Sequence, residues 1–268
     1  MKRIFILIMT ILIIFSFCSC EKDLINDADT GEIIISGKKN NYTDGTYYSY
    51  FDHFDADGFC GVVRMQIKDS IIKSVRFDYF NKESSSLSLT EDEKYAVLSA
   101  EFRAARKNLY TQTLSAQSTE NIPTNNANKY TGDFLRLADN ILSAAYIGAD
   151  KIIISESSAT YTQSMPLSDT IRATLQISYT SDKITDIRFD VTDQYYASLL
   201  TNEEICISLF GLTTDQIEEI LPALLDKSAE RKENTEVIYE KLFGVYNSLA
   251  DRIMQMHTAP QFNVEELF

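Results

Sequence analysis

One short block of the chain occurs twice, and this repeat limits the folds that the chain can adopt. Residues 72–78, Ile-Lys-Ser-Val-Arg-Phe-Asp, return as residues 184–190, Ile-Thr-Asp-Ile-Arg-Phe-Asp, with four identities in seven positions. Each copy follows a matched apolar segment, at 65–67 and at 175–177. The offset is 110 residues before the turn and 112 after it, so we expect a connection two residues longer in the second copy. The repeat predicts two related modules in tandem.

The segments around both copies alternate between apolar and polar residues, which is typical of a sheet with one solvated face. In the first module Val63, Met65 and Ile67 share one face of their strand. Tyrosine, phenylalanine and β-branched residues, which favour strands, are frequent in these segments. The expected strands are 46–51, 62–68 and 71–79 in the first module, and 152–155, 160–163, 171–179 and 184–192 in the second.

Helical spacing of apolar residues follows the strands in each module. Residues 90–93 and 201–204 match capping boxes, each with a threonine and a glutamate three positions later. The expected helices run from 90 to about 109, from 133 to Gly148, from 201, from 217 to 225 and from 237 to 256. Strands first and helices after give an α+β class, in which each module is an antiparallel, hairpin-rich sheet packed with helices.

The N-terminus predicts export. Lys2 and Arg3 precede an apolar run at 4–17, which is short for a membrane span and is typical of a secretory signal. Ser19 before Cys20 matches a lipoprotein signal, in which Cys20 becomes the lipidated first residue of the mature chain. An ordinary signal peptide or an uncleaved anchor is the alternative.

The predicted organisation therefore has four parts. They are a lipoprotein signal peptide at 1–20, a tether at 21–41, a first module at 42–150 and a divergent second module at 151–268. The lipid would anchor the protein to a bacterial membrane on its extracytoplasmic side, with a partner in the cell envelope.

The composition excludes some partners and leaves the cysteines open. A formal net charge of −14 disfavours nucleic acid, because phosphate binding needs clustered lysine and arginine. Cys60 and Cys206 lack CxxC spacing, so buried or free thiols are expected, with a disulfide between them as the alternative.

The opening of the first module resembles the FMN-binding lipoproteins. Residues 42–47, Tyr-Thr-Asp-Gly-Thr-Tyr, lead into the loop 55–59, Asp-Ala-Asp-Gly-Phe, and then into the hairpin at 63–78. The resemblance covers roughly 42–148 and, more weakly, the second module. Families of this type include membrane-tethered flavoproteins of extracellular electron transfer, which carry FMN as a phosphoester on the threonine of a Ser-Gly-Ala-Thr motif.

The flavin attachment motif of that family is degenerate in this chain. Residues 125–131 are Asn-Asn-Ala-Asn-Lys-Tyr-Thr, so Asn128 stands at the position of the flavin-accepting threonine. An amide cannot form the phosphoester, and Asn126 replaces the glycine that allows close approach of the backbone. We therefore expect no covalent flavin, and we expect Thr131 to cap the helix that follows.

Noncovalent FMN remains an alternative. A helix N-terminus near Thr131 offers free amides to a phosphate, although Asp133 would compete for them. Lys129 is the nearest cation in the sequence, and Tyr47 or Tyr130 could stack on an isoalloxazine ring. With Asn128 and Thr131, these residues are the candidate cofactor site.

Other groups of polar residues give no catalytic or metal set. Residues 53–58, His-Phe-Asp-Ala-Asp-Gly, resemble the start of a calcium loop, but Arg64 stands where a bidentate glutamate is required, so a solvated hairpin loop is expected. His53 and His257 are the histidines of the chain, about 200 residues apart, and no hydrolase, zinc, P-loop or dinucleotide motif occurs.

One charged pair occurs in both modules. The repeated Arg76 and Asp78, and Arg188 and Asp190, could form a ligand site on the solvated face of the sheet, but cross-strand charge pairing is the simpler interpretation.

The preferred hypothesis is a binding or accessory lipoprotein that is not an enzyme and needs no cofactor. The alternatives are an electron carrier with noncovalent FMN and a solute-binding or adhesin-like surface module.

Overall fold

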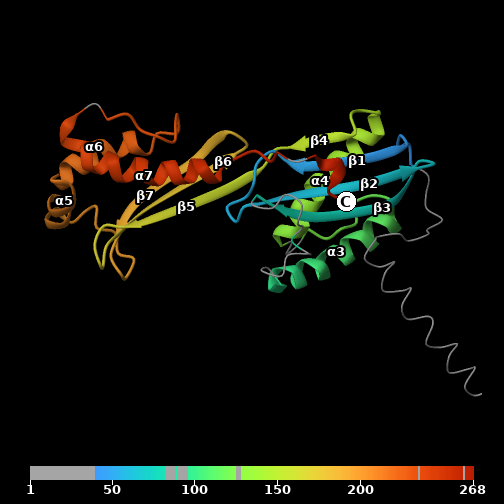
Figure 1. The fold of residues 1–268 in the computed structure, drawn as a ribbon, viewed down its shortest axis with the longest axis horizontal. Helices are drawn as coiled ribbons and strands as arrows, with labels where there is room; N and C mark the ends of the chain where they lie inside the picture. Colours follow the sequence, from blue (N-terminus) through green and yellow to red (C-terminus); the bar gives the residue numbers. More distant parts are fainter. Residues whose placement is uncertain (1–39, 83–88, 90–95, 125–127, 235, 262) are drawn as a thin grey trace, which may run out of the picture. The chain divides into compact units, whose positions relative to one another are not determined.

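The computed structural model describes residues 40–82, 89, 96–124, 128–234, 236–261 and 263–268. The predicted signal peptide with Cys20 lies outside the described residues, as do most of the predicted tether and the capping box expected at 90–93. The predicted α+β class is confirmed, because the described chain contains two sheets and several helices (Figure 1).

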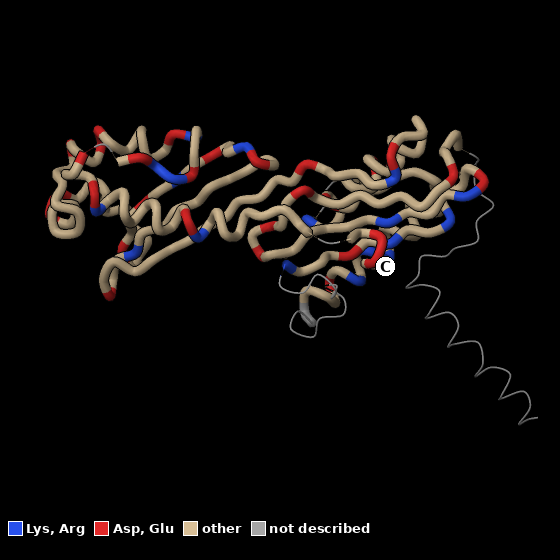
Figure 2. The backbone as a smooth tube through the Cα atoms, turned by 45° about the horizontal axis from the view of Figure 1, so that its top comes forward, with Lys and Arg blue, Asp and Glu red and all other residues tan. Residues whose placement is uncertain are grey.

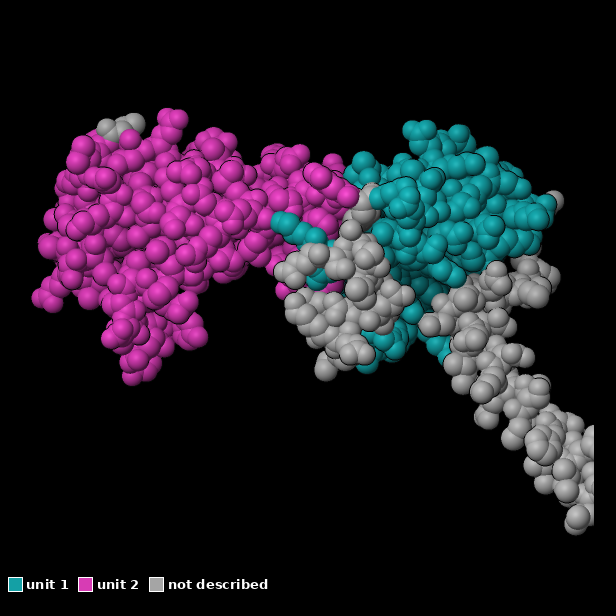
Figure 3. Space-filling view, in the orientation of Figure 1, with its two compact units in different colours: residues 1–50, 61–155, 263–268 teal, residues 51–60, 156–262 magenta. Residues whose placement is uncertain are grey.

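The chain forms two compact units (Figure 3), each described by itself below. Unit 1 comprises residues 1–50, 61–155 and 263–268, and unit 2 comprises 51–60 and 156–262. This division differs from the expected boundary at residue 150. Strand β4 (Ile152–Ser155) belongs to the sheet of unit 1, residues 51–60 belong to unit 2, and residues 263–268 belong to unit 1. Acidic and basic residues are scattered along the backbone of both units (Figure 2).

Unit 1 is built on a sheet with strand order β3-β2-β1-β4. The strands are β1 (Gly45–Phe51), β2 (Phe59–Lys68), β3 (Ile71–Asn81) and β4 (Ile152–Ser155). As the alternation predicts, Val63, Met65 and Ile67 of β2 are buried, whereas Gln66 and Lys68 are exposed. The sequence therefore located the strands of this sheet and the orientation of β2.

Two long helices pack on the sheet of unit 1. Helix α3 (Ala96–Ala116) lies against β3, and α4 (Lys129–Ile147) packs on α3 and β4. The apolar positions predicted for α4 form its buried face: Phe134, Leu137, Ala138, Ile141, Leu142 and Ala145. Gly148 ends α4 in the left-handed conformation, with φ of 68°, as the sequence predicts.

The C-terminal residues 263–268 also belong to unit 1. They contain a short 3₁₀ helix, η3 (Val264–Glu266), in which Val264 is buried. The ring of Phe268 contacts the ring of Phe80 at a centroid distance of 5.6 Å. This segment therefore adds to the packing of unit 1, although it follows unit 2 in the sequence.

Unit 2 has an antiparallel sheet with strand order β5-β6-β7. The strands are β5 (Ser158–Pro166), β6 (Arg172–Thr180) and β7 (Lys183–Thr192). Alternate residues of β6 are buried, namely Ala173, Leu175, Ile177 and Tyr179. Helix α7 (Glu240–Met256) packs on β5 and β6 and closes the core over the sheet.

The helices of unit 2 are α5 (Glu203–Phe210), α6 (Thr214–Leu224) and α7 (Glu240–Met256), with the 3₁₀ helix η2 (Val237–Tyr239) before α7. The capping box expected at 201–204 is shifted. Asn202 is the N-cap of α5, and its side chain accepts a hydrogen bond from Ile205 N at 3.1 Å. Thr213 and Gln216 form a capping box at α6, a Thr-x-x-Gln spacing that the sequence analysis did not select.

The turns of the two repeated hairpins have the same length, contrary to the longer connection expected in the second copy. Residues 69–70 join β2 to β3, and residues 181–182 join β6 to β7. Across the shift in pairing between β6 and β7, Tyr179 lies opposite Ile184 and Ser178 lies opposite Asp186, so Thr185 of β7 is the extra residue of a β-bulge. The added length of the second hairpin therefore lies in its strands and not in its turn.

The described cysteines are buried free thiols. Cys60 Sγ lies 3.3 Å from Phe51 O, and Cys206 Sγ lies 3.4 Å from Leu200 O. The expectation of buried or free thiols is confirmed for both. Among the described helices none combines the length and the apolar composition that a membrane crossing requires.

Candidate functional site

The N-terminus of α4, the expected flavin region, is capped by Asn128. Its side-chain oxygen accepts hydrogen bonds from Thr131 N at 3.0 Å and from Thr131 Oγ1 at 3.1 Å. The expectation that Thr131 caps this helix is wrong, because Thr131 lies inside the helix and donates to the cap. Asn128 therefore satisfies one of the amides that a phosphate would need.

The side chains around this cap form a packed cluster. Tyr79 donates a hydrogen bond from its hydroxyl to Asp133 Oδ2 at 2.6 Å, and Lys129 Nζ lies 4.0 Å from the same carboxylate oxygen. The ring of Tyr130 packs on Tyr79 and Phe102 at centroid distances of 5.9 and 5.3 Å. Lys129 and Tyr130 thus have partners within unit 1 that account for their positions.

Tyr47 does not join this cluster. Its side chain is buried, and its hydroxyl donates to Thr43 O at 3.0 Å, while Thr43 N donates to Ala145 O at 2.8 Å. Tyr47 therefore lies near the C-terminal end of α4. The 19 residues of α4 separate this end from Asn128 by about 28 Å, at a rise of 1.5 Å per residue. The structure brings 128–131 together and leaves Tyr47 apart from them.

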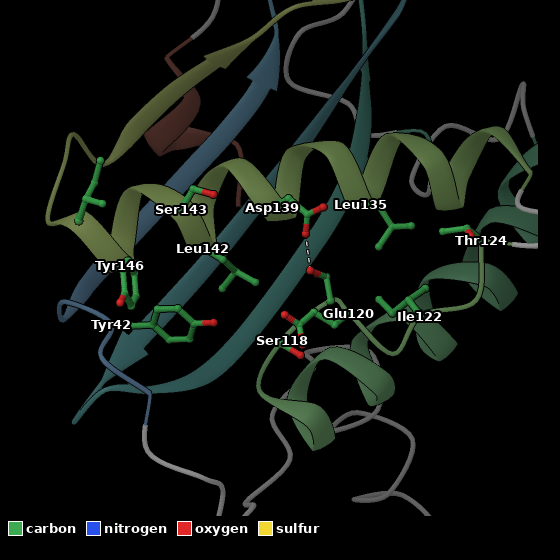
Figure 4. Close-up of a pocket in the computed structure, with 12 residues that line it drawn as sticks. Tyr42, Ser118, Glu120, Ile122, Thr124, Leu135, Asp139, Leu142, Ser143 and Tyr146 are labelled. Carbon is green, nitrogen blue, oxygen red and sulfur yellow. Dashed lines mark hydrogen bonds between the residues drawn. The ribbon is translucent and has the colours of Figure 1, made fainter.

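A large groove of unit 1 lies along α4, on the face beside its buried stripe (Figure 4). Its volume is about 690 Å³. The walls come from α4, from the segment after α3 and from Tyr42, which points into the groove before β1. We call it the α4 groove; it is lined by Tyr42, Ser118, Thr119, Glu120, Ile122, Thr124, Leu135, Asp139, Leu142, Ser143, Tyr146 and Ile147.

The polar side chains of the α4 groove are hydroxyls and carboxylates. Thr119 donates a hydrogen bond from its hydroxyl to Asp139. Burial, Glu120 and Asp139 together raise the pKa of Tyr42, so this phenol stays protonated at neutral pH. The Tyr42 hydroxyl lies 3.4 Å from the carbonyl oxygen of Gln117. None of the described lining residues is lysine or arginine, so the groove is acidic.

The apolar side chains of the α4 groove are partly open to solvent. Tyr146 is 62 % exposed and Ile147 is 75 % exposed. Two large apolar side chains are therefore exposed beside the acidic groups of the groove. The arrangement suits a ligand that carries both an apolar surface and a positive charge.

Sequence reasoning did not select the α4 groove. One signal was available, because Leu135, Asp139, Leu142 and Tyr146 share a face of the predicted helix at spacings of three and four. This face adjoins the core stripe but mixes polar and apolar residues. The other walls come from the Ser/Thr-rich segment after α3 and from Tyr42, whose proximity depends on tertiary packing.

The loop expected to be a solvated turn is closed by Asp55. Its Oδ1 accepts hydrogen bonds from Asp57 N at 3.0 Å and from Phe59 N at 2.8 Å, and Gly58 has φ of 81°. This Asx-type turn uses the carboxylate that a calcium ion would need. Within the described ranges no group of three or more His, Cys, Asp or Glu side chains is placed to hold a metal ion.

The two histidines stack on each other in unit 2. Their ring centroids are 4.2 Å apart, and His257 stacks in turn on Tyr179 at 3.9 Å. His53 Nε2 lies 3.1 Å from Asp182 Oδ1, and its Nδ1 lies 3.2 Å from Asp52 Oδ1. Burial and the neighbouring His53 lower the pKa of His257. This buried column joins the 51–60 segment to the end of α7 within unit 2.

The repeated aspartates and Arg188 have partners other than the cross-strand arginine–aspartate pairs that were expected. Asp78 is buried and accepts from Arg106 of α3 at 3.1 Å. Arg188 pairs with Asp186 of its own strand at 2.9 Å, and Asp190 accepts from Ser198 at 2.6 Å. Arg106 and Ser198 lie outside the hairpins, and the backbone amides of Tyr79 and Val191 also donate to Asp78 and Asp190 within their own strands.

No protein-family model and no curated protein matches the chain. A crystal structure of a protein from Clostridium perfringens, solved by a structural genomics consortium, matches part of the chain. It shares 18 % identity and covers 42 % of this chain and 96 % of its own, with a TM-score of 0.33.

Proposed function

We propose that this chain is an exported, lipid-anchored binding protein and that the α4 groove is its ligand site. The groove carries the proposal, because its volume of about 690 Å³ is typical of sites that take small molecules or short peptide segments. The lipid anchor rests on the signal motif that ends at Cys20. Binding without catalysis is the simplest role for such a surface.

The chemistry of the groove favours a ligand with a cationic group beside apolar surface. Glu120 and Asp139 supply negative charge, and Tyr146 and Ile147 supply exposed apolar area. An anionic ligand such as FMN would meet repulsion from both carboxylates. A segment of an envelope protein that bears lysine or arginine next to leucine could pair its charge with the carboxylates and pack its leucine on the apolar side chains of the groove.

The test uses residues 21–268, the mature chain without its lipid, which retains every described residue. Two labelled peptides are compared by fluorescence anisotropy at low salt, one of alternating leucine and lysine and one of alternating leucine and glutamate. We expect saturable binding of the lysine peptide and none of the glutamate peptide. Equal binding of both peptides would contradict the proposal.

Two isosteric variants place the binding in the α4 groove. Asp139→Asn and Glu120→Gln each remove one negative charge without a large change in shape, and we expect each to weaken binding of the lysine peptide about 3- to 10-fold. Glu101→Gln on α3 is the matched control, because Glu101 is an exposed glutamate outside the groove. If the control weakens binding as much as the groove variants, the net charge of the chain and not the groove accounts for the affinity.

The flavin alternatives have a separate test. An absorbance spectrum of the same protein is recorded after FMN is added and the excess is removed. We expect no flavin band, because Asn128 cannot form the phosphoester and the cap occupies an amide of α4. A band that survives denaturation would contradict the assignment of Asn128, and a band released on denaturation would support a noncovalent electron carrier.

A further inference from the structure

A second pocket lies in unit 2, and it is apolar. Its volume is about 420 Å³, and we call it the α7 pocket. The residues come from the end of β5 and the turn after it, from the end of α5 and from one face of α7. They are Met165, Leu167, Leu209, Phe210, Lys241, Gly244, Val245 and Ser248.

The α7 face of this pocket is a regular stripe. Lys241, Gly244, Val245 and Ser248 follow one another at spacings of three, one and three, which places them along one side of the helix. The stripe begins with an exposed cation and ends with a hydroxyl, about 10 Å apart along the axis. Apolar residues of α5 and of the β5 end face it across the pocket.

Gly244 is not required by the packing of α7. A Cβ placed on Gly244 would meet no atom within 4 Å, and its backbone is ordinary helix. Glycine inside a helix costs about 1 kcal/mol relative to alanine, so a residue with a side chain would stabilise α7. Because Gly244 has no side chain, the pocket is open over this residue, and we call this part of the lining the floor of the α7 pocket.

The single charged residue of the pocket is a lysine in a chain of net charge −14. Within the described part of the chain, Lys241 forms no ion pair. A lysine beside an apolar cavity attracts an anion whose remaining part is hydrocarbon, because the cation neutralises the head while the walls remove the chain from water.

We propose that the α7 pocket binds a free medium-chain fatty acid, with the carboxylate at Lys241 and the hydrocarbon chain over Gly244. The volume lies at the lower end of the range for small-molecule sites, which favours a medium chain over a long one. This site is independent of the α4 groove, since it takes a ligand of opposite charge in the other unit.

Isothermal titration of residues 21–268 with decanoate, below the concentration at which it forms micelles, tests the proposal. We expect one decanoate per chain and about a fourfold gain in affinity for each CH₂ added from hexanoate to decanoate. Decylamine should bind at least tenfold more weakly than decanoate. Equal affinity for the amine and the acid, or no saturation with decanoate, would overturn the assignment.

Three variants locate the ligand. Gly244→Leu fills the floor and should weaken decanoate binding at least tenfold, whereas Gly244→Ala, the matched control, should retain binding and raise the melting temperature. Lys241→Gln should weaken decanoate about tenfold and leave decanol unchanged. Lys241 is exposed, so this variant keeps the fold if Gly244→Leu does not. Wild-type affinity in both Gly244→Leu and Lys241→Gln would overturn the proposal.

Two further measurements distinguish the α7 pocket from the α4 groove and from a membrane surface. Asp139→Asn, which tests the α4 groove, should not change decanoate affinity. Vesicles of phosphatidylcholine containing phosphatidylglycerol should not compete with decanoate, because the site is proposed for the free acid. Competition by the vesicles would show that the pocket recognises a lipid surface, and it would contradict the proposal.

Discussion

At the scale of single residues, Gln117 shows how a side chain can replace a strand. It is buried and follows α3 in the left-handed conformation, with φ of 57°. Its side-chain oxygen accepts from Ile72 N at 2.7 Å, and its amide donates to Ile72 O at 3.2 Å. The amide group thus pairs with β3 as a neighbouring strand would, and these hydrogen bonds stabilise a backbone conformation that glycine or asparagine usually adopts.

Substitution by asparagine should therefore change the free energy of unfolding in opposite directions at Gln117 and at Tyr196, two residues in the left-handed conformation. Gln117→Asn shortens the side chain and leaves both polar groups of Ile72 unsatisfied, so we expect a loss of about 2 kcal/mol in the free energy of unfolding. Tyr196 has φ of 64° and is 88 % exposed, so Tyr196→Asn should be neutral or stabilise by up to about 1 kcal/mol. Urea denaturation measures both. Stabilisation by both variants would show that strain outweighs the hydrogen bonds of Gln117.

Asn128 has a structural role that does not depend on flavin. Asn128→Ala removes the cap of α4 and should cost about 1 kcal/mol, whereas Asn128→Asp retains an acceptor and should cost little. Thermal unfolding followed by circular dichroism compares the two variants. If alanine and aspartate have equal effects, the cap contributes nothing measurable.

At the scale of elements, the histidine column joins segments that are far apart in the sequence. His257 at the end of α7 stacks on His53 of the 51–60 segment, and its Nε2 lies 3.0 Å from Ser181 O. Asp52, Asp182 and Glu230 are the carboxylates around the column. Glu230 also accepts a hydrogen bond from the hydroxyl of Tyr179 at 3.3 Å.

This column predicts a loss of stability on mild acidification. Burial and His53 lower the pKa of His257 below its ordinary value of 6.5. Below pH 6.5 the unfolded chain therefore binds a proton that the folded chain does not, so the free energy of unfolding should fall as the pH decreases from about 7.5 to 5.5.

Urea denaturation at several pH values measures this slope. His257→Phe retains a stacked ring but has no titrating nitrogen, and its free energy of unfolding should depend less on pH over the same range. Because Asp52 has a lowered pKa, its stabilising contribution is lost only near and below pH 3.8, outside this window. An unchanged slope in His257→Phe would assign the pH dependence to other groups.

At the scale of the whole molecule, the two units have separate cores. Phe134 is fully buried in unit 1, where it contacts Phe77 at a centroid distance of 5.6 Å. Leu249 is fully buried in the core of unit 2. Each unit includes a segment that is distant along the chain from the rest of it. Unit 1 includes residues 263–268, and unit 2 includes residues 51–60.

Core truncations should therefore act on separate unfolding transitions. Phe134→Ala should cost about 3 to 5 kcal/mol in unit 1, and Leu249→Ala about 2 to 5 kcal/mol in unit 2. Differential scanning calorimetry should resolve two transitions, with each variant lowering only one of them. One cooperative transition that both variants lower would mean that the units unfold together.

The sequence alone determined the α+β class, most strand positions and the buried faces of β2 and α4. These features follow from local periodicity, because a strand or helix that buries one face must place apolar residues at spacings of two or of three and four. The end of α4 at Gly148 was predictable for a similar reason, since glycine adopts the left-handed conformation without steric cost.

Tertiary structure decided the boundaries of the units, the partners of the buried polar groups and the candidate sites. Arg106 pairs with Asp78, and Gln117 pairs with Ile72, across separations of 28 and 45 residues. The α4 groove gathers Tyr42, the segment after α3 and one face of α4. Local periodicity carries no information about such contacts, because they depend on how the elements pack. The sequence could place each residue on a face of its own element, and packing alone brought those faces together.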